Sequence, residues 1–210
     1  MSALTITDVS IYLTDKPLLS ALSFSVNEGE VLSIMGPSGC GKSTLLNFLC
    51  GTLPATFRAS GEVRLNNKSL TCLAVEQRKV GILYQSPLLF PHMNNLENLM
   101  FAIPARIKGK QRQALALDKL SQFNLADKAL STPQHLSGGQ QARIALLRTL
   151  LSEPEYLLLD EPFGKLDSTL RQSVREFVLE QVQISKLPTI LVTHDTEDCQ
   201  AMGNNVLHLA

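Results

Sequence analysis

The sequence predicts an α/β fold with a mixed sheet, an N-terminal antiparallel β subdomain and an inserted helical subdomain. Three observations support this prediction. Apolar and polar residues alternate over 4–26, a nearly continuous apolar run at 31–35 leads into a glycine-rich loop, and leucines recur at helical spacing between 88 and 151. We expect residues 1–210 to form a single unit, with the helical insertion at about 88–151.

The first half of the chain contains the β subdomain and the start of the core. Residues 4–9 and 18–26 alternate as half-buried antiparallel strands do. Residues 31–35 are almost all apolar, which is typical of a strand buried on both faces. The glycine-rich residues 36–41 then precede a helical stretch at 42–50, so the order is strand, loop, helix.

The second half contains the helical insertion and the rest of the core sheet. Leucine and other apolar residues recur at helical spacing over 115–123 and 144–151. Short apolar runs at 156–159 and 189–193 flank a helix-like segment at 168–184. This spacing is that of parallel strands joined by a helical crossover, so we expect the core sheet to resume there.

Composition excludes several classes of function. Nineteen basic residues balance nineteen acidic ones, so no field of one sign favours a nucleic acid or a lipid surface, and we expect no nucleic acid partner. No apolar run approaches the roughly 20 residues that span a bilayer, and no leader pattern opens the chain, so a cytoplasmic location is expected. The four cysteines are scattered and fit neither a zinc cluster nor a disulfide framework.

A phosphate-binding loop is the first motif that carries chemistry. The pattern G-x-x-x-x-G-K-[ST] is filled by Gly36, Pro37, Ser38, Gly39, Cys40, Gly41, Lys42 and Ser43. Backbone N–H groups of such a loop close around a β-phosphate, Lys42 supplies a cation, and the Ser43 hydroxyl is a ligand for Mg²⁺. Thr44, the next residue, is assigned to the same nucleotide site.

A pair of carboxylates is the second motif. The apolar strand at 156–159 ends in Asp160 and Glu161. An acid at this position can hold Mg²⁺ through water, and a second acid can polarise the attacking water, so we expect Asp160 on the metal side and Glu161 as general base. Without the phosphate loop, the two acids would be read as a strand end before Pro162.

A second glycine-containing loop narrows the choice of family. GTPases and small-molecule kinases share the first two motifs, but a GTPase needs N-K-x-D, and the segment at 67–70 lacks the Asp. The sequence Leu-Ser-Gly-Gly-Gln at 136–140 opens a helical run, and it resembles the signature of ATP-binding-cassette (ABC) ATPases. The family signature residues are Ser137, Gly138, Gly139 and Gln140.

Further roles follow from this resemblance, which covers essentially the whole chain. It implies that Gln85 touches Mg²⁺ and the water, and that Asp167 lies in a loop at a dimer interface. It also implies that His194 is the switch histidine, which contacts the γ-phosphate and holds the attacking water and Glu161 in place. Lys165 stands where the family more usually has a small residue. Tyr12 is the aromatic residue expected to stack on adenine, and Leu13 is the alternative if the register differs by one.

The resemblance implies an ATPase with ATP and Mg²⁺ as cofactors, acting as a homodimer when ATP is bound. Gly51 and the stretch 85–92 resemble bacterial import-type subunits of the thiamine, iron or polyamine kind. Such subunits lie on the cytoplasmic face of the inner membrane against a permease, with an extracytoplasmic substrate-binding protein. The apolar residues between 85 and 104 suit a groove for a permease helix or the core of the insert. A soluble cassette ATPase is the alternative function.

Overall fold

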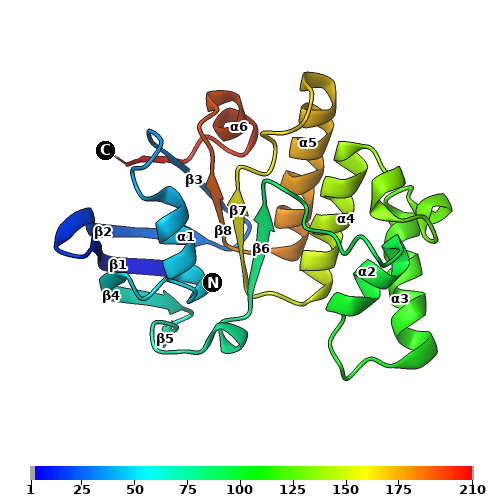
Figure 1. Ribbon diagram of the computed structural model, residues 1–210, viewed down its shortest axis with the longest axis horizontal. Helices are drawn as coiled ribbons and strands as arrows, with labels where there is room; N and C mark the ends of the chain where they lie inside the picture. The colour runs from blue at the N-terminus through cyan, green and yellow to red at the C-terminus, as the bar shows by residue number, and fades with distance from the viewer. Residues whose placement is uncertain (1–2, 210) are drawn as a thin grey trace.

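The computed structural model describes residues 3–209, and its strands form two separate sheets (Figure 1). One sheet is antiparallel, with strand order β2-β1-β4-β5. Its members are β1 (Ala3–Leu13), β2 (Lys16–Asn27), β4 (Phe57–Leu65) and β5 (Lys68–Ser69). The predicted N-terminal antiparallel subdomain is therefore confirmed, and it also includes the two strands β4 and β5.

The other sheet is parallel throughout, with strand order β6-β7-β8-β3-β9. Its strands are β3 (Val31–Met35), β6 (Val80–Tyr84), β7 (Tyr156–Asp160), β8 (Thr189–Val192) and β9 (Val206–His208). Every pair of neighbours is parallel, so the carboxyl ends of all five strands lie at one edge of the sheet. The α/β class predicted from the sequence is confirmed, with the antiparallel and parallel strands divided between two sheets.

The helices lie on both faces of the parallel sheet and beyond one end of it (Figure 1). They are α1 (Lys42–Cys50), α2 (Asn95–Ala102), α3 (Gly109–Gln122), α4 (Gly138–Leu151), α5 (Ser168–Ser185) and α6 (Thr196–Ala201). Short 3-10 turns lie at Val75–Gln77, Ala126–Lys128 and Pro133–His135. Helices α2, α3 and α4 gather at one end of the molecule, while α1 lies between the two sheets. None of the helices within residues 3–209 has the length and apolar character needed to cross a membrane.

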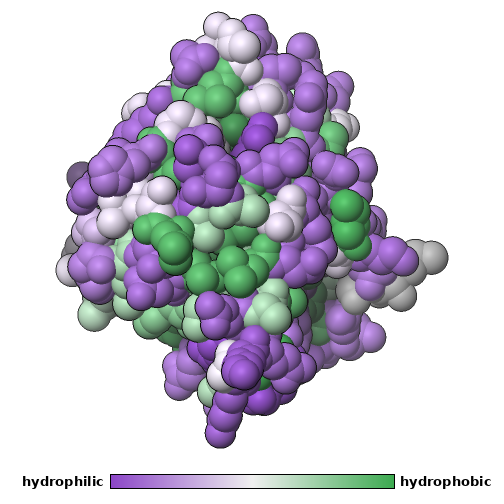
Figure 2. All heavy atoms as spheres, turned by 90° about the vertical axis from the view of Figure 1, so that its right-hand side faces the viewer, coloured by the Kyte–Doolittle hydropathy of each residue, from purple (hydrophilic) through white to green (hydrophobic). Residues whose placement is uncertain are grey.

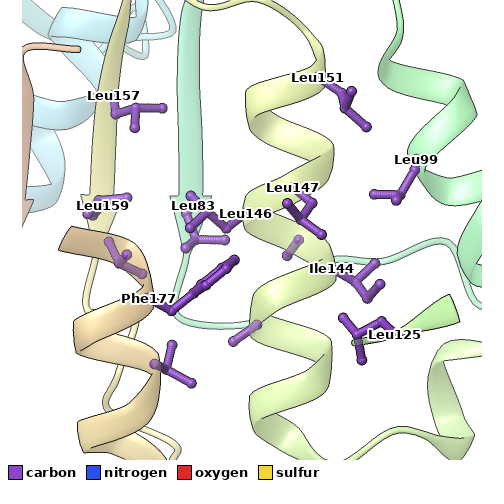
Figure 3. Packing of buried hydrophobic residues seen from close by; sticks show 14 of the residues in the cluster. Leu83, Leu99, Leu125, Ile144, Leu146, Leu147, Leu151, Leu157, Leu159 and Phe177 are labelled. Carbon is purple, nitrogen blue, oxygen red and sulfur yellow. The ribbon is translucent and has the colours of Figure 1, made fainter. Parts of the chain in front are cut away.

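Two hydrophobic cores meet at strand β7, whose side chains alternate between them. Leu157 and Leu159 belong to the core beneath α4 and α5, which Figure 3 shows with leucines of several elements pointing toward Phe177. Tyr156 and Leu158 belong to the core shared by α1 and the antiparallel sheet. The Tyr156 hydroxyl also donates to the Leu49 carbonyl at 3.0 Å. This two-sided burial fixes the strand end from which Asp160 and Glu161 project.

Candidate nucleotide site

The predicted site residues follow neighbouring strands of the parallel sheet. Gly36 follows β3, Asp160 ends β7, His194 comes two residues after β8, and Gln85 follows β6. In parallel α/β sheets, ligands bind in the crevice at the carboxyl ends of the strands. The topology therefore brings these four segments, far apart in the sequence, to one edge of the sheet.

The phosphate loop has the backbone that an anion cradle needs. Gly39 and Gly41 have φ angles of 84° and 98°, in the left-handed region that favours glycine. Among the described residues, the N–H groups of Ser38, Gly39 and Gly41 have no protein acceptor. A cavity of 270 Å³ at this place is lined by Ser38, Gly39, Gly41, Lys42, Ser43, Thr44 and Glu161. The loop thus presents free donors to a hollow that also contains a carboxylate.

Lys42 lies within this loop and is largely buried. Its ammonium donates to the carbonyls of Gly36 at 2.7 Å and Pro37 at 2.9 Å. These bonds close the loop around the lysine and keep its charge beside the free N–H groups at the start of α1. Gly36 itself has no room for a side chain, because an added Cβ would lie 2.7 Å from both the Cys40 sulfur and the Leu209 carbonyl oxygen.

The acid pair at the end of β7 is electrostatically coupled to the loop. Burial raises the pKa of Asp160, and the charge of Glu161 raises it further, while Lys42 acts in the opposite direction. The charges of Lys42 and Glu161 therefore both act on the carboxyl group of Asp160. A partly buried carboxyl group whose charged form is disfavoured gains from a bound cation.

Glu161 contacts the predicted switch histidine. The Nδ1 atom of His194 lies 3.2 Å from Oε1 of Glu161. Glu161 has a φ of 46°, an unusual backbone for a residue other than glycine, and its N–H donates to the Val192 carbonyl at 2.9 Å. The hydrogen bond to β8 holds the strained turn, which directs the carboxylate into the cavity rather than along the strand.

The residues predicted to hold Mg²⁺ fit that ion by their chemistry. Mg²⁺ prefers oxygen ligands and is usually bound through one or two side chains together with substrate phosphates and waters. Ser43 lines the phosphate cavity, and Asp160 is partly buried beside it. The Gln85 side chain packs against Gly164, where an added Cβ would lie 3.0 Å from Gln85 Nε2. The hydroxyl comes from the first turn of α1, the carboxylate from the end of β7, and the amide oxygen from the residue after β6.

The signature loop does not line the phosphate cavity of its own chain. Ser137 caps α4: its Oγ accepts from the Gln140 N–H at 3.3 Å, and its own N–H donates to Gln140 Oε1 at 3.0 Å. An added Cβ on Gly139 would lie 2.5 Å from the Leu170 side chain of α5, so that side chain would have to move. The loop is built and held by its own contacts, apart from the phosphate loop.

The remaining predicted residues lie on the surface. Asp167 caps α5, with its side chain accepting from the Leu170 N–H at 3.0 Å. Lys165 donates to Ser86 Oγ at 2.6 Å, so the loop before α5 is tied to the segment that follows Gln85. Tyr12 and Leu13 are both exposed at the end of β1.

One cluster of ion pairs beside the site was missed by sequence reasoning. Arg171 and Arg175 of α5 form ion pairs with Asp195 and Asp198, directly beside His194. The two arginines are four residues apart on a predicted helix, so they share one face. That spacing was a detectable signal, although it does not say which acids the arginines meet.

Comparison with known proteins decides the family. Residues 19–164 match the ABC transporter family. The chain belongs to this family. It is an ATP-binding subunit of the ABC transporter type and an ATPase, and family membership implies a membrane permease as partner.

Its relatives include both short and long ABC subunits. The chain is 42% identical over 207 residues to the uncharacterized ABC transporter ATP-binding protein YnjD of Escherichia coli K12, covering 99% of this chain and 95% of that one. It is 36% identical to the Fe(3+) ions import ATP-binding protein FbpC 1 of Rhizobium meliloti, covering 89% of this chain. It is also 36% identical to the spermidine/putrescine import ATP-binding protein PotA of Pasteurella multocida, covering 93% of this chain. The chain spans 52% of each of these two longer relatives.

Proposed function

We propose that this ABC subunit hydrolyses ATP as one half of a head-to-tail homodimer that ATP and Mg²⁺ close. The observation that carries the proposal is the separation of two loops within one chain. The phosphate cavity is lined by 38–44 and Glu161, and the signature loop is not part of it. A second copy in head-to-tail orientation supplies the missing loop, and each copy then completes the site of the other.

In this dimer, the residues of one chain bind and orient ATP. The N–H groups of the phosphate loop and Lys42 hold the β- and γ-phosphates, and Ser43, Asp160 and Gln85 hold Mg²⁺. Mg²⁺ bound by these residues would supply positive charge to the phosphates. Tyr12 stacks on the adenine ring. Catalysis is then mostly positioning and charge stabilisation.

Water is the nucleophile in this proposal. Glu161 accepts a proton from the attacking water, and His194, which contacts Glu161, keeps the carboxylate aimed and meets the γ-phosphate. The Ser137 hydroxyl and the N–H groups of Gly138 and Gly139 donate to the γ-phosphate held by the opposite copy, with Gln140 maintaining the turn. Asp167 lies at the interface between the copies.

The permease docks beside the helical subdomain. A groove of 490 Å³ lies between β6 and α4, where Arg148 stacks on Phe90 at 5.2 Å and Phe90 packs edge-on against Phe101 at 4.8 Å. Leu88 and Phe101 line this groove and are exposed, while Leu89 packs against the core. The face that carries the helical subdomain shows apolar side chains gathered among hydrophilic ones (Figure 2). A short amphipathic permease helix suits such a surface.

The further parts of the proposal concern organisation and location. Residues 1–210 act as a single ATPase unit whose helical insertion runs from about 88 to 151. The subunit lies on the cytoplasmic face of the inner membrane, bound through the permease. An extracytoplasmic substrate-binding protein delivers the substrate, and the balanced charge of the chain favours no nucleic acid partner.

Gentle purification from membranes tests this function. Tagged protein is solubilised from cell membranes, purified, and its companions are identified by mass spectrometry. We expect one polytopic membrane protein in about equal amount, lost in Phe101→Asp but retained in Leu130→Asp, an exposed residue outside the groove. Recovery only from the soluble fraction, with ribosomal or DNA-bound companions or none, would instead support a soluble cassette ATPase.

A further inference from the structure

A cluster of charged residues lies where α5 packs against the start of α6. Arg171 Nη1 contacts Asp195 Oδ2 at 2.7 Å. Arg175 Nε donates to Asp198 Oδ1 at 2.7 Å, and its Nη2 also contacts that carboxylate. Glu197 meets Arg175 Nη1 at 3.4 Å from the solvent side. Two arginines of one helix thus hold the acids at the start of the next.

The centre of this cluster is buried. The side chains of Arg175 and Asp198 are 4% and 3% exposed, whereas that of Glu197 is 75% exposed. Burial disfavours the charged form of Arg175, but its hydrogen bonds and charge interaction with Asp198 outweigh burial and raise its pKa. Removing one partner of such a pair leaves an uncompensated buried charge. The Arg175–Asp198 pair is therefore a rigid point of the structure.

Thr193 connects this pair to the backbone on both sides of His194. Its hydroxyl donates to Asp198 Oδ2 at 2.6 Å and accepts from the Asp195 N–H at 3.1 Å. The Thr193 N–H donates to the Ile34 carbonyl of β3 at 3.3 Å. The Thr193 hydroxyl thus connects the backbone N–H of Asp195, the residue after His194, to the buried Arg175–Asp198 pair.

His194 itself has little to hold it. Its side chain is 67% exposed, and within residues 3–209 its one recorded polar side-chain contact is with Glu161. The place from which the ring reaches Glu161 is therefore set by the backbone that carries it. A neighbouring backbone anchored to a buried ion pair keeps that place constant.

We propose that Arg175, Asp198 and Thr193 are positioning residues for His194. They hold the backbone at 193–195 so that the imidazole stays in contact with Glu161. This inference rests on the proposed role of His194 in hydrolysis. It assigns three buried residues to the alignment of the histidine and the general base.

Substitutions at Thr193 test the proposal with little change of shape. Thr193→Val removes the hydroxyl, and Thr193→Ser keeps it. We expect kcat to fall about tenfold in Thr193→Val with KM for ATP within about twofold, and Thr193→Ser to retain most of kcat. Full kcat in Thr193→Val would overturn the proposal.

Asp198→Asn has a matched control on the same helix. Asp198→Asn weakens the buried contact with Arg175 and is expected to lower kcat as Thr193→Val does. Glu197→Gln makes the same chemical change at an exposed site and is expected to leave kcat unchanged. Equal losses of kcat in both variants would overturn the proposal. Because an unpaired Arg175 can prevent folding, Thr193→Val carries the test if Asp198→Asn is insoluble.

A double-mutant test separates positioning from a general structural effect. If Thr193 acts through His194, Thr193→Val should change kcat by less than about twofold in a His194→Ala background. A tenfold loss that persists in this background would overturn the proposal, because Thr193 would then act by another route.

The imidazole NMR signals of His194 in nucleotide-free protein provide a readout that does not depend on activity. The chain has four histidines, so His194→Ala identifies the signal. We expect the signal to shift in Thr193→Val and to stay in place in Glu197→Gln. An unchanged signal in Thr193→Val would overturn the proposal. If His194→Ala itself retains full kcat, the role of His194 in hydrolysis fails, and the NMR shift still tests positioning.

Discussion

The phosphate loop and the signature loop both contain glycines and both open a helix, yet they are held in different ways. In the phosphate loop, the N–H groups of Ser38, Gly39 and Gly41 have no acceptor within residues 3–209, and a lysine lies in the loop. The signature loop uses a capping box, in which Ser137 and Gln140 satisfy one another's N–H groups, and its first turn contains no basic residue. The first loop can thus bind an anion, whereas hydrogen bonds within the second loop already satisfy its capping N–H groups.

This difference explains why one chain has two such loops. A loop with a cation and several free donors binds phosphate by itself, because the helix N-terminus and the lysine both favour negative charge. A self-capped loop without a cation adds only a few donors to a phosphate that is already held. The signature loop is therefore suited to complete a site that another copy of the chain has filled.

The largest expected effect is at Lys42. In Lys42→Ala the phosphate loop loses its cation and its two bonds to the Gly36 and Pro37 carbonyls. We expect ATP hydrolysis to fall roughly 10²- to 10³-fold, the scale of losing one well-placed group that stabilises transition-state charge. Steady-state phosphate release measures this, with Lys68→Ala on exposed β5 as the control. Unchanged turnover would remove the phosphate loop from the mechanism.

Helix α1, which follows the phosphate loop, ends at Cys50, whose thiol is buried. Burial raises the pKa of Cys50 to about 11 from 9.0, while Cys72 is exposed. A rise of two units lowers the thiolate fraction about 100-fold at any pH below both values, because only the thiolate reacts. At pH 8 an alkylating reagent should label Cys72 quickly and Cys50 only after unfolding, as peptide mass spectrometry can show. Equal labelling in the folded protein would mean that α1 is less firmly packed.

Ser137→Ala should separate the structural and functional parts of the signature loop. Losing the cap costs about 1 kcal/mol of stability. The matched control is Asn94→Ala, because Asn94 and Glu97 form an equivalent capping box at α2. We expect similar losses of stability in both variants by thermal melting, but a fall in hydrolysis of about tenfold only in Ser137→Ala, since one donor to the γ-phosphate is lost. Equal activities would show that the signature loop is only a cap.

The smallest effect concerns the adenine ring, which neither loop contacts. Tyr12→Ala should weaken ATP binding about fivefold, the equivalent of about 1 kcal/mol of stacking. Binding of inorganic tripolyphosphate should be unchanged, since the phosphate loop alone holds it. Leu13→Ala is the control, and both affinities can be measured by calorimetry. A larger effect in Leu13→Ala than in Tyr12→Ala would move the stacking position by one residue.

Local patterns predicted much of the fold. The strand Val31–Met35 and the helix Lys42–Cys50 have the expected bounds, because a buried apolar run and a glycine-rich loop mark them clearly. The strand Phe57–Leu65 was missed, since only Val63 and Leu65 within it are buried and Gly61 interrupts it. Gly61 is required there by tertiary packing, because an added Cβ would lie 2.5 Å from the Asp8 carbonyl oxygen.

In the site too, the features that depend on tertiary packing could not be predicted from the sequence. The phosphate loop and the Asp160-Glu161 pair are contiguous in sequence and could be located without a structure. The pairing of Arg175 with Asp198 joins two residues 23 positions apart and depends on how α5 packs against α6. The contact between Glu161 and His194 was implied only by resemblance to the family, because it arises from two adjacent parallel strands.

Sedimentation of Glu161→Gln in ATP and Mg²⁺ tests the central claim most directly. This variant keeps the shape of Glu161 and lacks the base, so it should bind ATP, stall before hydrolysis and accumulate as the closed dimer. The account predicts a species of twice the 23.0 kDa chain mass, absent without ATP and absent when Lys42→Ala is added. A species that stays monomeric at saturating ATP and Mg²⁺ would contradict the claim that the signature loop of one copy completes the phosphate site of another.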